Sequence, residues 1–191
     1  MSAVLGAQRP EQQAAGPSSP VAGPDGGDRG RFRAACSQFP TGVAVVTASS
    51  GSQLFGATVN AFASLTVEPP QVLVCLAESS NTWSAIARSG AFAVNLLAAD
   101  QVALADLFAS KDPDKLARVS HERGAVGAPL LSDTVATFEC MLVTTAPSAT
   151  HRVLVGRVMA FASDPSRDPL MFFRSRLLQG PPAGAASSPI R

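Results

Sequence analysis

Residues 41–48, TGVAVVTA, decide how the rest of the chain is interpreted, because this run is short, rich in β-branched residues and flanked by turn formers. Such a run indicates a buried β-strand rather than a helix. Residues 71–77, QVLVCLA, and 92–96, FAVNL, have the same character. The first half of the chain therefore predicts a group of buried strands.

A second strand group is expected at residues 137–146, TFECMLVTTA, and 152–162, RVLVGRVMAFA. Gly156 in the latter run predicts a bulge or bend of a closed barrel. Strands dominate without regular β-α-β alternation, which favours an antiparallel barrel over a doubly wound sheet. The predicted fold class is mainly β with helical excursions.

Three helices are expected between and before these strands. Residues 80–90 predict a helix with a hydroxyl or Asn cap near its start and Gly90 as its stop signal. Residues 100–109, DQVALADLFA, carry a helical apolar stripe after an Asp cap. Residues 32–38 predict a short leading helix.

Composition limits the classes of function. The 191 residues are 46% hydrophobic and 15% charged, which suits one compact domain. Residues 1–30 and 180–191 are rich in Pro, Gly, Ala and Ser and are expected to be disordered, leaving residues 31–179 as the folded unit. The net charge of +1 does not indicate a nucleic-acid partner. Without an apolar run of membrane-spanning length or a secretory signal, we expect a cytoplasmic protein with no membrane association.

The sequence offers few groups for side-chain chemistry. Three scattered cysteines and two histidines make neither a disulfide framework nor a metal site, so we expect no bound metal. The glycine-rich fingerprints of Rossmann folds and P-loops are missing, and so is a nucleophile elbow. Any chemistry must therefore come from a bound cofactor.

Two segments are candidate ligand contacts. In residues 56–65, GATVNAFASL, the polar residues Thr58, Asn60 and Ser64 alternate, so they are expected on one face, where they would bind the polar edge of a flat heterocycle or form the outer face of an ordinary strand. In residues 79–83, SSNTW, a helix N-terminus follows a buried strand. This second segment suits a phosphate, although a plain N-cap explains it equally well.

The segments FPTGVAVVTA, GATVNAFASLTVEPPQVLVCL, SSNT, SGAFAVNLLAADQVALADLFAS and DPLMFFRSRL occur in an order and spacing that resemble the short-chain flavin reductase family over residues 32–178. The resemblance is closest to the reductase components of two-component flavin-dependent monooxygenases. It implies a flavin-binding split β-barrel of Greek-key-like antiparallel type, a homodimer, FMN or FAD as the flavin, and NADH or NADPH as hydride donor. It also implies a partner oxygenase that receives the reduced flavin.

The same resemblance implies roles for particular residues. Those expected to meet the flavin ring and ribityl chain are Thr58, Val59, Asn60, Ala61 and Ser64. Those expected at the phosphate are Ser79, Ser80, Asn81 and Thr82, with Phe108 and Lys115 completing the nearby cofactor contacts. Asn81 stands where the family often has Arg or Lys, so the positive charge on the phosphate is expected from Lys111 or Lys115 instead.

The end of the chain supplies the remaining candidates. His151 matches the histidine of a Gly-Asp-His motif whose Gly-Asp is lost here, and it is the one expected catalytic residue; the alternative is an exposed histidine at a barrel end. The resemblance places Phe172 and Arg174 near the flavin and nicotinamide. The family often has Tyr at the positions of Phe172 and Leu177, and this chain has no Tyr. Arg174 could equally be a solvated strand end.

Two other functions remain open. The same barrel could be a non-catalytic flavin-binding or redox-sensing module, because a fold alone does not fix an activity. An oxidase of a phosphorylated small amine would require a basic substrate pocket that the sequence does not supply.

Overall fold

The computed structural model describes residues 29–182, so the segments 1–28 and 183–191, which belong to the arm and tail predicted as disordered, lie outside it. The chain divides into two units, Met1–Cys36 and Ser37–Arg191. The described part of the first unit is helix α1, Arg29–Cys36, which has no buried residue. A leading helix was predicted at 32–38, and α1 begins earlier, within the stretch expected to be disordered.

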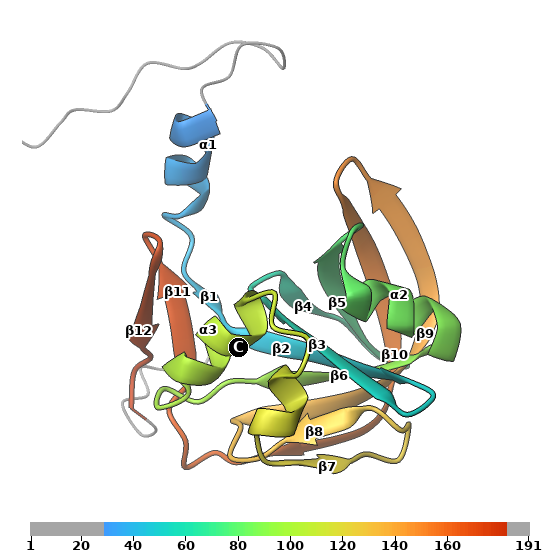
Figure 1. The fold of residues 1–191 in the computed structure, drawn as a ribbon. Helices are drawn as coiled ribbons and strands as arrows, with labels where there is room; N and C mark the ends of the chain where they lie inside the picture. Colours follow the sequence, from blue (N-terminus) through green and yellow to red (C-terminus); the bar gives the residue numbers. More distant parts are fainter. Residues whose placement is uncertain (1–28, 183–191) are drawn as a thin grey trace, which may run out of the picture. The chain divides into compact units, whose positions relative to one another are not determined.

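Strands dominate the second unit (Figure 1). Its helices are α2, Asn81–Ser89, and α3, Val102–Ala109, followed by the 3₁₀ turn η1, Lys115–Arg118. Its strands are β1 Thr41–Gly42, β2 Ala44–Ser50, β3 Gln53–Val59, β4 Phe62–Val67, β5 Pro70–Ala77, β6 Ala91–Leu96, β7 His121–Arg123, β8 Pro129–Leu131, β9 Ala136–Ser148, β10 His151–Ser163, β11 Leu170–Phe173 and β12 Arg176–Gln179.

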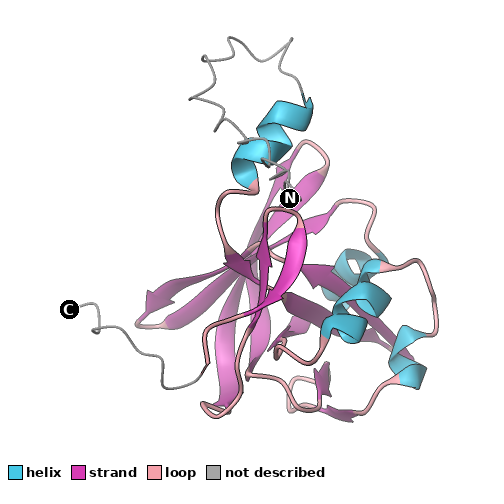
Figure 2. Ribbon diagram, turned by 90° about the vertical axis from the view of Figure 1, so that its left-hand side faces the viewer, coloured by secondary structure: helices cyan, strands magenta, loops and turns pink. Residues whose placement is uncertain are grey.

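Seven strands form one antiparallel sheet in the order β3-β2-β6-β9-β10-β5-β4, and Figure 2 shows how strongly it curves. The two edge strands, β3 and β4, are consecutive in the chain and are joined only by Asn60 and Ala61. Within residues 29–182 no ladder of hydrogen bonds closes the sheet between them, so the barrel is split at this point. The predicted fold class is confirmed, with the covalent link from β3 to β4 in place of the last ladder.

Strand β2 is buried on both faces. Ala44, Val46 and Ala48 belong to a core shared with α2, whereas Val45 belongs to a second core shared with α3. The strand predicted at 41–48 is divided at Val43, because Val43 N donates to Leu170 O (3.1 Å) and Val43 O accepts from Leu97 N (2.9 Å). Val43 thus links the small β1-β11-β12 sheet to the main sheet.

The two helices of the second unit differ in how well the sequence predicted them. Helix α2 has the predicted caps, with Ser80 at its start and Gly90 in the left-handed conformation (φ 71°) at its end. The Asp100 cap predicted for α3 is wrong, since the N-cap is Gln101, which makes no side-chain capping hydrogen bond. The Gln101 amide instead accepts from Ala98 N (3.0 Å) and donates to Ser132 O (2.9 Å).

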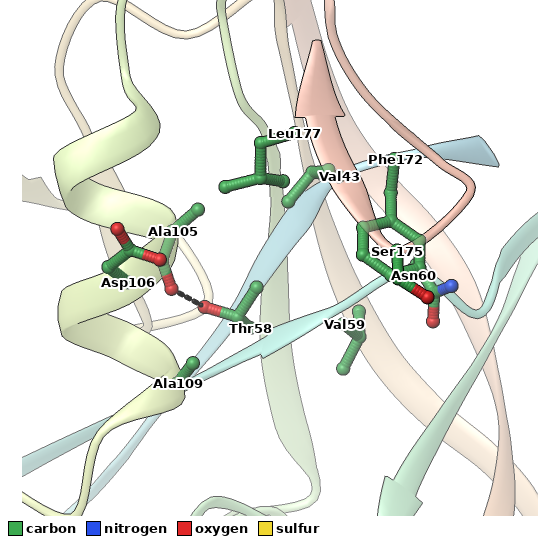
Figure 3. A pocket seen from close by; sticks show the side chains of 10 residues that line it. All are labelled: Val43, Thr58, Val59, Asn60, Ala105, Asp106, Ala109, Phe172, Ser175 and Leu177. Carbon is green, nitrogen blue, oxygen red and sulfur yellow. Dashed lines mark hydrogen bonds between the residues drawn. The ribbon is translucent and has the colours of Figure 1, made fainter. Parts of the chain in front are cut away.

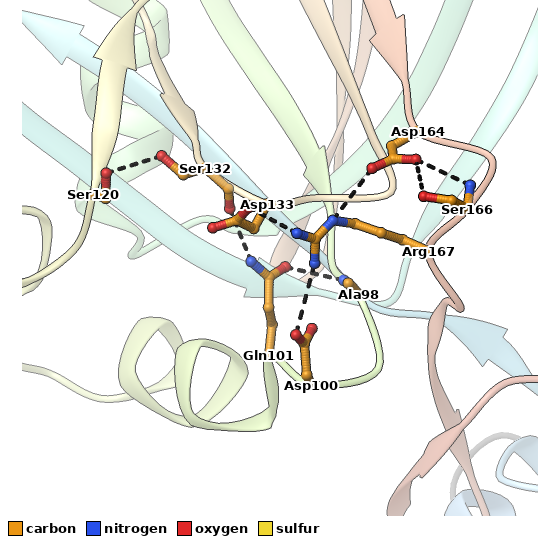
Figure 4. Close-up of polar contacts among 9 residues, drawn as sticks. All are labelled: Ala98, Asp100, Gln101, Ser120, Ser132, Asp133, Asp164, Ser166 and Arg167. Atoms are coloured by element: carbon orange, nitrogen blue, oxygen red, sulfur yellow. Dashed lines mark hydrogen bonds and ion pairs between the residues drawn. The ribbon is translucent and has the colours of Figure 1, made fainter.

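Asp100 takes part in a loop cluster built around Arg167 (Figure 4). The Arg167 guanidinium contacts Asp133 (2.7 Å), Asp164 (3.4 Å) and Asp100 (3.7 Å), which lie in three separate connections of the chain. Hydrogen bonds from Ser166 and the charge of Arg167 hold the pKa of Asp164 below its usual range. The cluster therefore links the loop that leads into α3 to the β8–β9 and β10–β11 connections.

The bulge predicted at Gly156 is confirmed by a shift of register between Val155 and Gly156 in the β9–β10 pairing. The long β9–β10 hairpin is the orange pair of strands in Figure 1. A Cβ atom at position 156 would overlap the Phe92 ring and lie 2.9 Å from Cys140 Cβ, and both of these residues are fully buried. Only glycine lets β10 approach the core this closely.

We predict that Gly156→Ala lowers the free energy of unfolding by about 1–3 kcal/mol, because the fully buried Phe92 ring cannot move aside without repacking the core. Urea denaturation measures this. Gly42→Ala is the matched control, since a Cβ there meets no atom within 4 Å and should change stability by less than about 0.5 kcal/mol. Equal stability of the two variants would contradict the packing argument.

Candidate functional site

Three adjoining cavities lie along the end of β3, and all three are lined by Thr58. The largest, of about 710 Å³, lies between β3, the start of α2 and the end of α3. The second, of about 390 Å³, lies between β3, α3 and the β11–β12 hairpin (Figure 3). The third, of about 240 Å³, lies between the β3–β4 link, β5 and the start of β10. We call these three cavities together the β3 groove.

Helix α3 forms one wall of the β3 groove, and two contacts fix it against β3. Thr58 Oγ1 donates to Ala105 O (2.7 Å), which is the dashed line in Figure 3. A Cβ at Gly56 would lie 2.5 Å from the ring of Phe108, so the missing side chain lets this buried ring pack directly on the strand. The predicted residues Thr58 and Phe108 therefore belong to one wall.

The turn between β5 and α2 supplies hydrogen-bond donors at one end of the β3 groove. Ser79, Ser80, Asn81 and Thr82 all line the largest cavity. The Ser80 hydroxyl caps the helix by accepting from Trp83 N (3.5 Å). The first amides of a helix have no acceptor within it, and the helix dipole adds partial positive charge at the same end. This turn therefore suits an anionic group.

Two lysines face this donor end from the other side of the largest cavity. Lys111 is exposed, whereas Lys115 is half-buried, and its Nζ donates to Ser110 O (2.7 Å) and Phe108 O (3.1 Å). Burial lowers the pKa of Lys115, and the charge of Asp112 partly opposes this effect. Asp112 also lines the cavity but is paired with Arg118 at 2.6 Å.

The β3–β4 link and His151 border the third cavity. Val59, Asn60 and Ala61 line it together with His151, the first residue of β10, which pairs with Ala77 of β5. The imidazole is exposed, and its Nδ1 lies 2.9 Å from Thr150 Oγ1. The structure thus brings His151 to the same groove as the residues of the β3–β4 link.

Most of the predicted site residues meet in the β3 groove. They are Thr58, Val59, Asn60, Ala61, Ser79, Ser80, Asn81, Thr82, Phe108, Lys115, His151 and Phe172.

Two predicted residues do not line the β3 groove. Ser64 is exposed on β4, because the expected single strand over 56–65 is wrong: the chain leaves β3 at Val59 and enters β4 at Phe62. Arg174 lies in the β11–β12 turn with φ 49°, where its Nε donates to Gln38 Oε1 (3.0 Å) and its guanidinium lies over the Phe173 ring. The alternating pattern that placed Ser64 on the same face as Thr58 holds only within one strand, and Ser64 lies on the next one.

The sequence reasoning missed several lining residues. Asp106 and Ala109 of α3 face the 390 Å³ cavity, as do Ser175 and Leu177 of the closing hairpin. Asp106 is the one ionisable residue among those lining this cavity. The spacing of Ala105 and Ala109 by four residues, which puts both on one helical face, was the available signal.

Some groups do not add to the site. The described residues contain no group of three or more His, Cys, Asp or Glu side chains placed to hold a metal ion. Burial raises the pKa of the Cys140 thiol to about 12 and also raises that of Cys75. Among the helices of residues 29–182, none is long and apolar enough to cross a membrane.

Comparison with known proteins gives this geometry a context. The family model for the flavin reductase-like domain matches residues 36–181. The reductase subunit HsaB of a flavin-dependent monooxygenase from Rhodococcus jostii is 37% identical over 78% of this chain and 76% of that protein. The NADH-dependent FMN reductase RutF of Cronobacter sakazakii is 34% identical over 82% of this chain and 96% of that protein.

A solved structure is similar over an equal extent. The NADH:FAD oxidoreductase SgcE6 of Streptomyces globisporus C-1027, in complex with NAD and FAD fragments, matches with a TM-score of 0.79 and 30% identity. The match covers 87% of this chain and 99% of that chain.

We predict that Thr58→Val lowers the free energy of unfolding by about 1 kcal/mol, because valine keeps the shape of threonine but cannot donate to Ala105 O. Chemical denaturation measures the effect. Thr144→Val on β9 is the matched control, because the exposed Thr144 side chain makes no hydrogen bond within residues 29–182. A loss of stability in the control as large as that in Thr58→Val would refute a specific β3–α3 contact.

Proposed function

Because the chain belongs to the flavin reductase-like domain family, we propose that it transfers hydride from NADH to FMN or FAD and supplies the reduced flavin to a separate monooxygenase component. The observation that carries this proposal is the β3 groove itself. Hydrogen-bond donors and lysines lie at one end of it and small residues of the β3–β4 link at the other. A flavin nucleotide has the same polarity, a phosphate at one end and a flat ring at the other.

The donor end of the β3 groove fits the flavin phosphate. We place the phosphate at the turn of Ser79, Ser80 and Thr82, where first-turn amides and hydroxyls are available. Asn81 carries no charge, so the compensating cations are Lys111 and Lys115 across the cavity. Because both lysines come from the segment after α3, the phosphate would bring α3 and α2 together.

The other end fits the flavin ring. The small residue Ala61 and the backbone of Val59 and Asn60 admit a flat heterocycle, and His151 lies at the border of the same cavity. When bound, the flavin accepts hydride from the nicotinamide, which is chemistry of the cofactors rather than of a side chain. The chain's own task is to hold the two rings in register and to exclude water.

The nicotinamide suits the 390 Å³ cavity beside Phe172. Phe172 offers an aromatic face for stacking, although without the hydroxyl of the tyrosine often found in this family it cannot donate a hydrogen bond. The Asp106 carboxylate in the same cavity can accept hydrogen bonds from ribose hydroxyls. FMN and FAD share the ring and first phosphate that these residues would contact, so both remain candidate substrates.

A non-catalytic flavin-binding or redox-sensing module is the second candidate. HsaB is named a reductase subunit, RutF an FMN reductase and SgcE6 an NADH:FAD oxidoreductase, which favours the enzyme. The amine-oxidase alternative has less support, because the cations of the largest cavity, Lys111 and Lys115, face a helix start that suits the flavin phosphate itself.

We further propose a homodimer that uses exposed apolar side chains of β4, β9 and β10. Of the ten large apolar side chains that are exposed within residues 29–182, six lie on these strands, namely Leu65, Val67, Met141, Val143, Met159 and Phe161. A large exposed apolar patch marks an interaction surface in soluble proteins.

The proposed activity predicts that the purified protein consumes NADH when FMN or FAD is added, followed by absorbance at 340 nm. We expect His151→Ala to lower kcat about tenfold with little change in flavin affinity, because His151 borders the ring end and not the phosphate end. His121→Ala is the control, since His121 lies on β7 outside the β3 groove. Absence of turnover with either flavin and either nicotinamide nucleotide would refute the reductase.

The dimer predicts that Phe161→Asp converts the protein to a monomer in light scattering, because a charge replaces a ring that is 72% exposed on the proposed interface. Phe39→Asp is the matched control, since Phe39 is 73% exposed but lies outside β4, β9 and β10. A wild-type protein that is monomeric at micromolar concentration would exclude this proposal.

A further inference from the structure

A second polar cluster lies next to the phosphate end of the β3 groove, centred on Arg152. Its guanidinium donates to both carboxylate oxygens of Glu78, from Nε to Oε2 (3.0 Å) and from Nη2 to Oε1 (2.8 Å). A third donor, Nη1, reaches Thr145 Oγ1 (3.1 Å), and the guanidinium lies 4.8 Å from the centroid of the Trp83 ring. Arg152 thus binds Glu78 in a two-pronged geometry that only arginine provides.

The cluster belongs to the turn that we assign to the phosphate, but it does not line the β3 groove. Glu78 stands two residues before the N-cap Ser80, and Glu78 N donates to Thr150 O (2.9 Å). Consecutive Cα atoms are about 3.8 Å apart, so the Cα atoms of Glu78 and Ser80 lie within about 7.6 Å of each other. Arg152 follows His151 on β10, and neighbouring residues of a strand point to opposite faces. The Arg152 side chain therefore lies on the face of β10 opposite to that of His151, outside the β3 groove.

Glu78 presents an electrostatic problem for this site. A phosphate monoester carries a charge of about −1.5 to −2 at neutral pH, and an uncompensated carboxylate less than about 10 Å away repels it. The residues of the turn itself, Ser79 to Thr82, carry no positive charge that would offset Glu78. The hydrogen bonds of Arg152 hold the pKa of Glu78 below its usual range, so the carboxylate stays ionised at neutral pH.

We propose that Arg152 is a positioning residue for flavin phosphate binding, which cancels the charge of Glu78 and ties the β5–α2 turn to β10. This inference rests on the proposed function, because it assumes that the turn receives the flavin phosphate. Arg152 itself does not touch the ligand. Arg152 affects ligand affinity by neutralising Glu78, so its effect is expected only for a ligand that carries a phosphate.

A role in stability alone does not account for the cluster. The two side chains remain 20% and 45% exposed, and pairs of this kind contribute little to the free energy of folding. Because the Arg152–Glu78 pair lies next to the proposed phosphate site, its net charge affects phosphate binding.

The test compares FMN with riboflavin, which has the same ring and ribityl chain but no phosphate. Binding is titrated by quenching of flavin fluorescence in the absence of nicotinamide, with the full-length protein. We expect Arg152→Met to weaken FMN binding about five- to tenfold and to leave riboflavin binding unchanged, because methionine keeps the packing on Trp83 but not the charge.

Three further variants separate charge from structure. Arg152→Lys should bind FMN within about twofold of wild type, because it keeps the charge without the two-pronged geometry. Glu78→Gln added to Arg152→Met should restore FMN affinity, because it removes the charge that Arg152 no longer cancels. Arg157→Met on the same strand is the matched control, since Arg157 makes no ion pair within residues 29–182, and it should not alter binding.

Each outcome decides the inference. Equal weakening of FMN and riboflavin by Arg152→Met, with no recovery on adding Glu78→Gln, would show a purely structural role and overturn it. Unchanged FMN affinity in Arg152→Met, with normal wild-type binding, would overturn the inference and leave the proposed function intact. A wild-type protein that binds neither FMN nor riboflavin would overturn both.

Discussion

The burial of β2 on both faces is the constraint on which the rest of the structure depends. One face carries the core beneath α2, and the other carries the core beneath α3. Polar groups also meet here, because Asn95 Nδ2 donates to Val45 O (3.0 Å) while its Oδ1 accepts from Leu131 N (2.8 Å). Because β6 pairs along one edge of β2, β3 takes the other edge and itself becomes an edge strand of the sheet. The β3 groove forms where that edge strand ends.

The end of β3 borders the cavities because β3 is an edge strand, paired only with β2, and that pairing ends at Val59. The chain passes from one sheet edge to the other through Asn60 and Ala61, and no ladder joins β3 to β4 across this gap within the described part of the chain. Helix ends approach the same place, the start of α2 from one side and the end of α3 from the other. The site therefore combines the end of an edge strand with the ends of two helices, which neither a closed barrel nor a single strand would provide.

The strands β2, β5, β6, β9 and β10, helix α2 and most of the site could be predicted from the sequence, because they depend on local patterns such as the run at 71–77 and the caps Ser80 and Gly90. The errors concern places where tertiary contacts override the pattern. Alternation over 56–65 fails because the chain changes sheet edge at Asn60, which leaves Ser64 on a separate strand. Aspartate is a typical N-cap residue, but the Asp100 carboxylate contacts Arg167, which is distant in sequence. Asp106 was missed because a single carboxylate on a helix gives no pattern.

The charges at the phosphate end bear on how a flavin would be held under the proposed function. The β5–α2 turn contains no positively charged residue. The half-buried Lys115 already donates to Ser110 O and Phe108 O. Attraction for the phosphate then comes from amides and hydroxyls of the turn and from Lys111 and Lys115 across the cavity, and this arrangement binds more weakly than a cation fixed in the turn itself. Moderate affinity is what a reductase needs if its flavin is a substrate that leaves after reduction. The absence of a basic residue at Asn81 is therefore consistent with transfer of the flavin to a partner rather than with permanent retention.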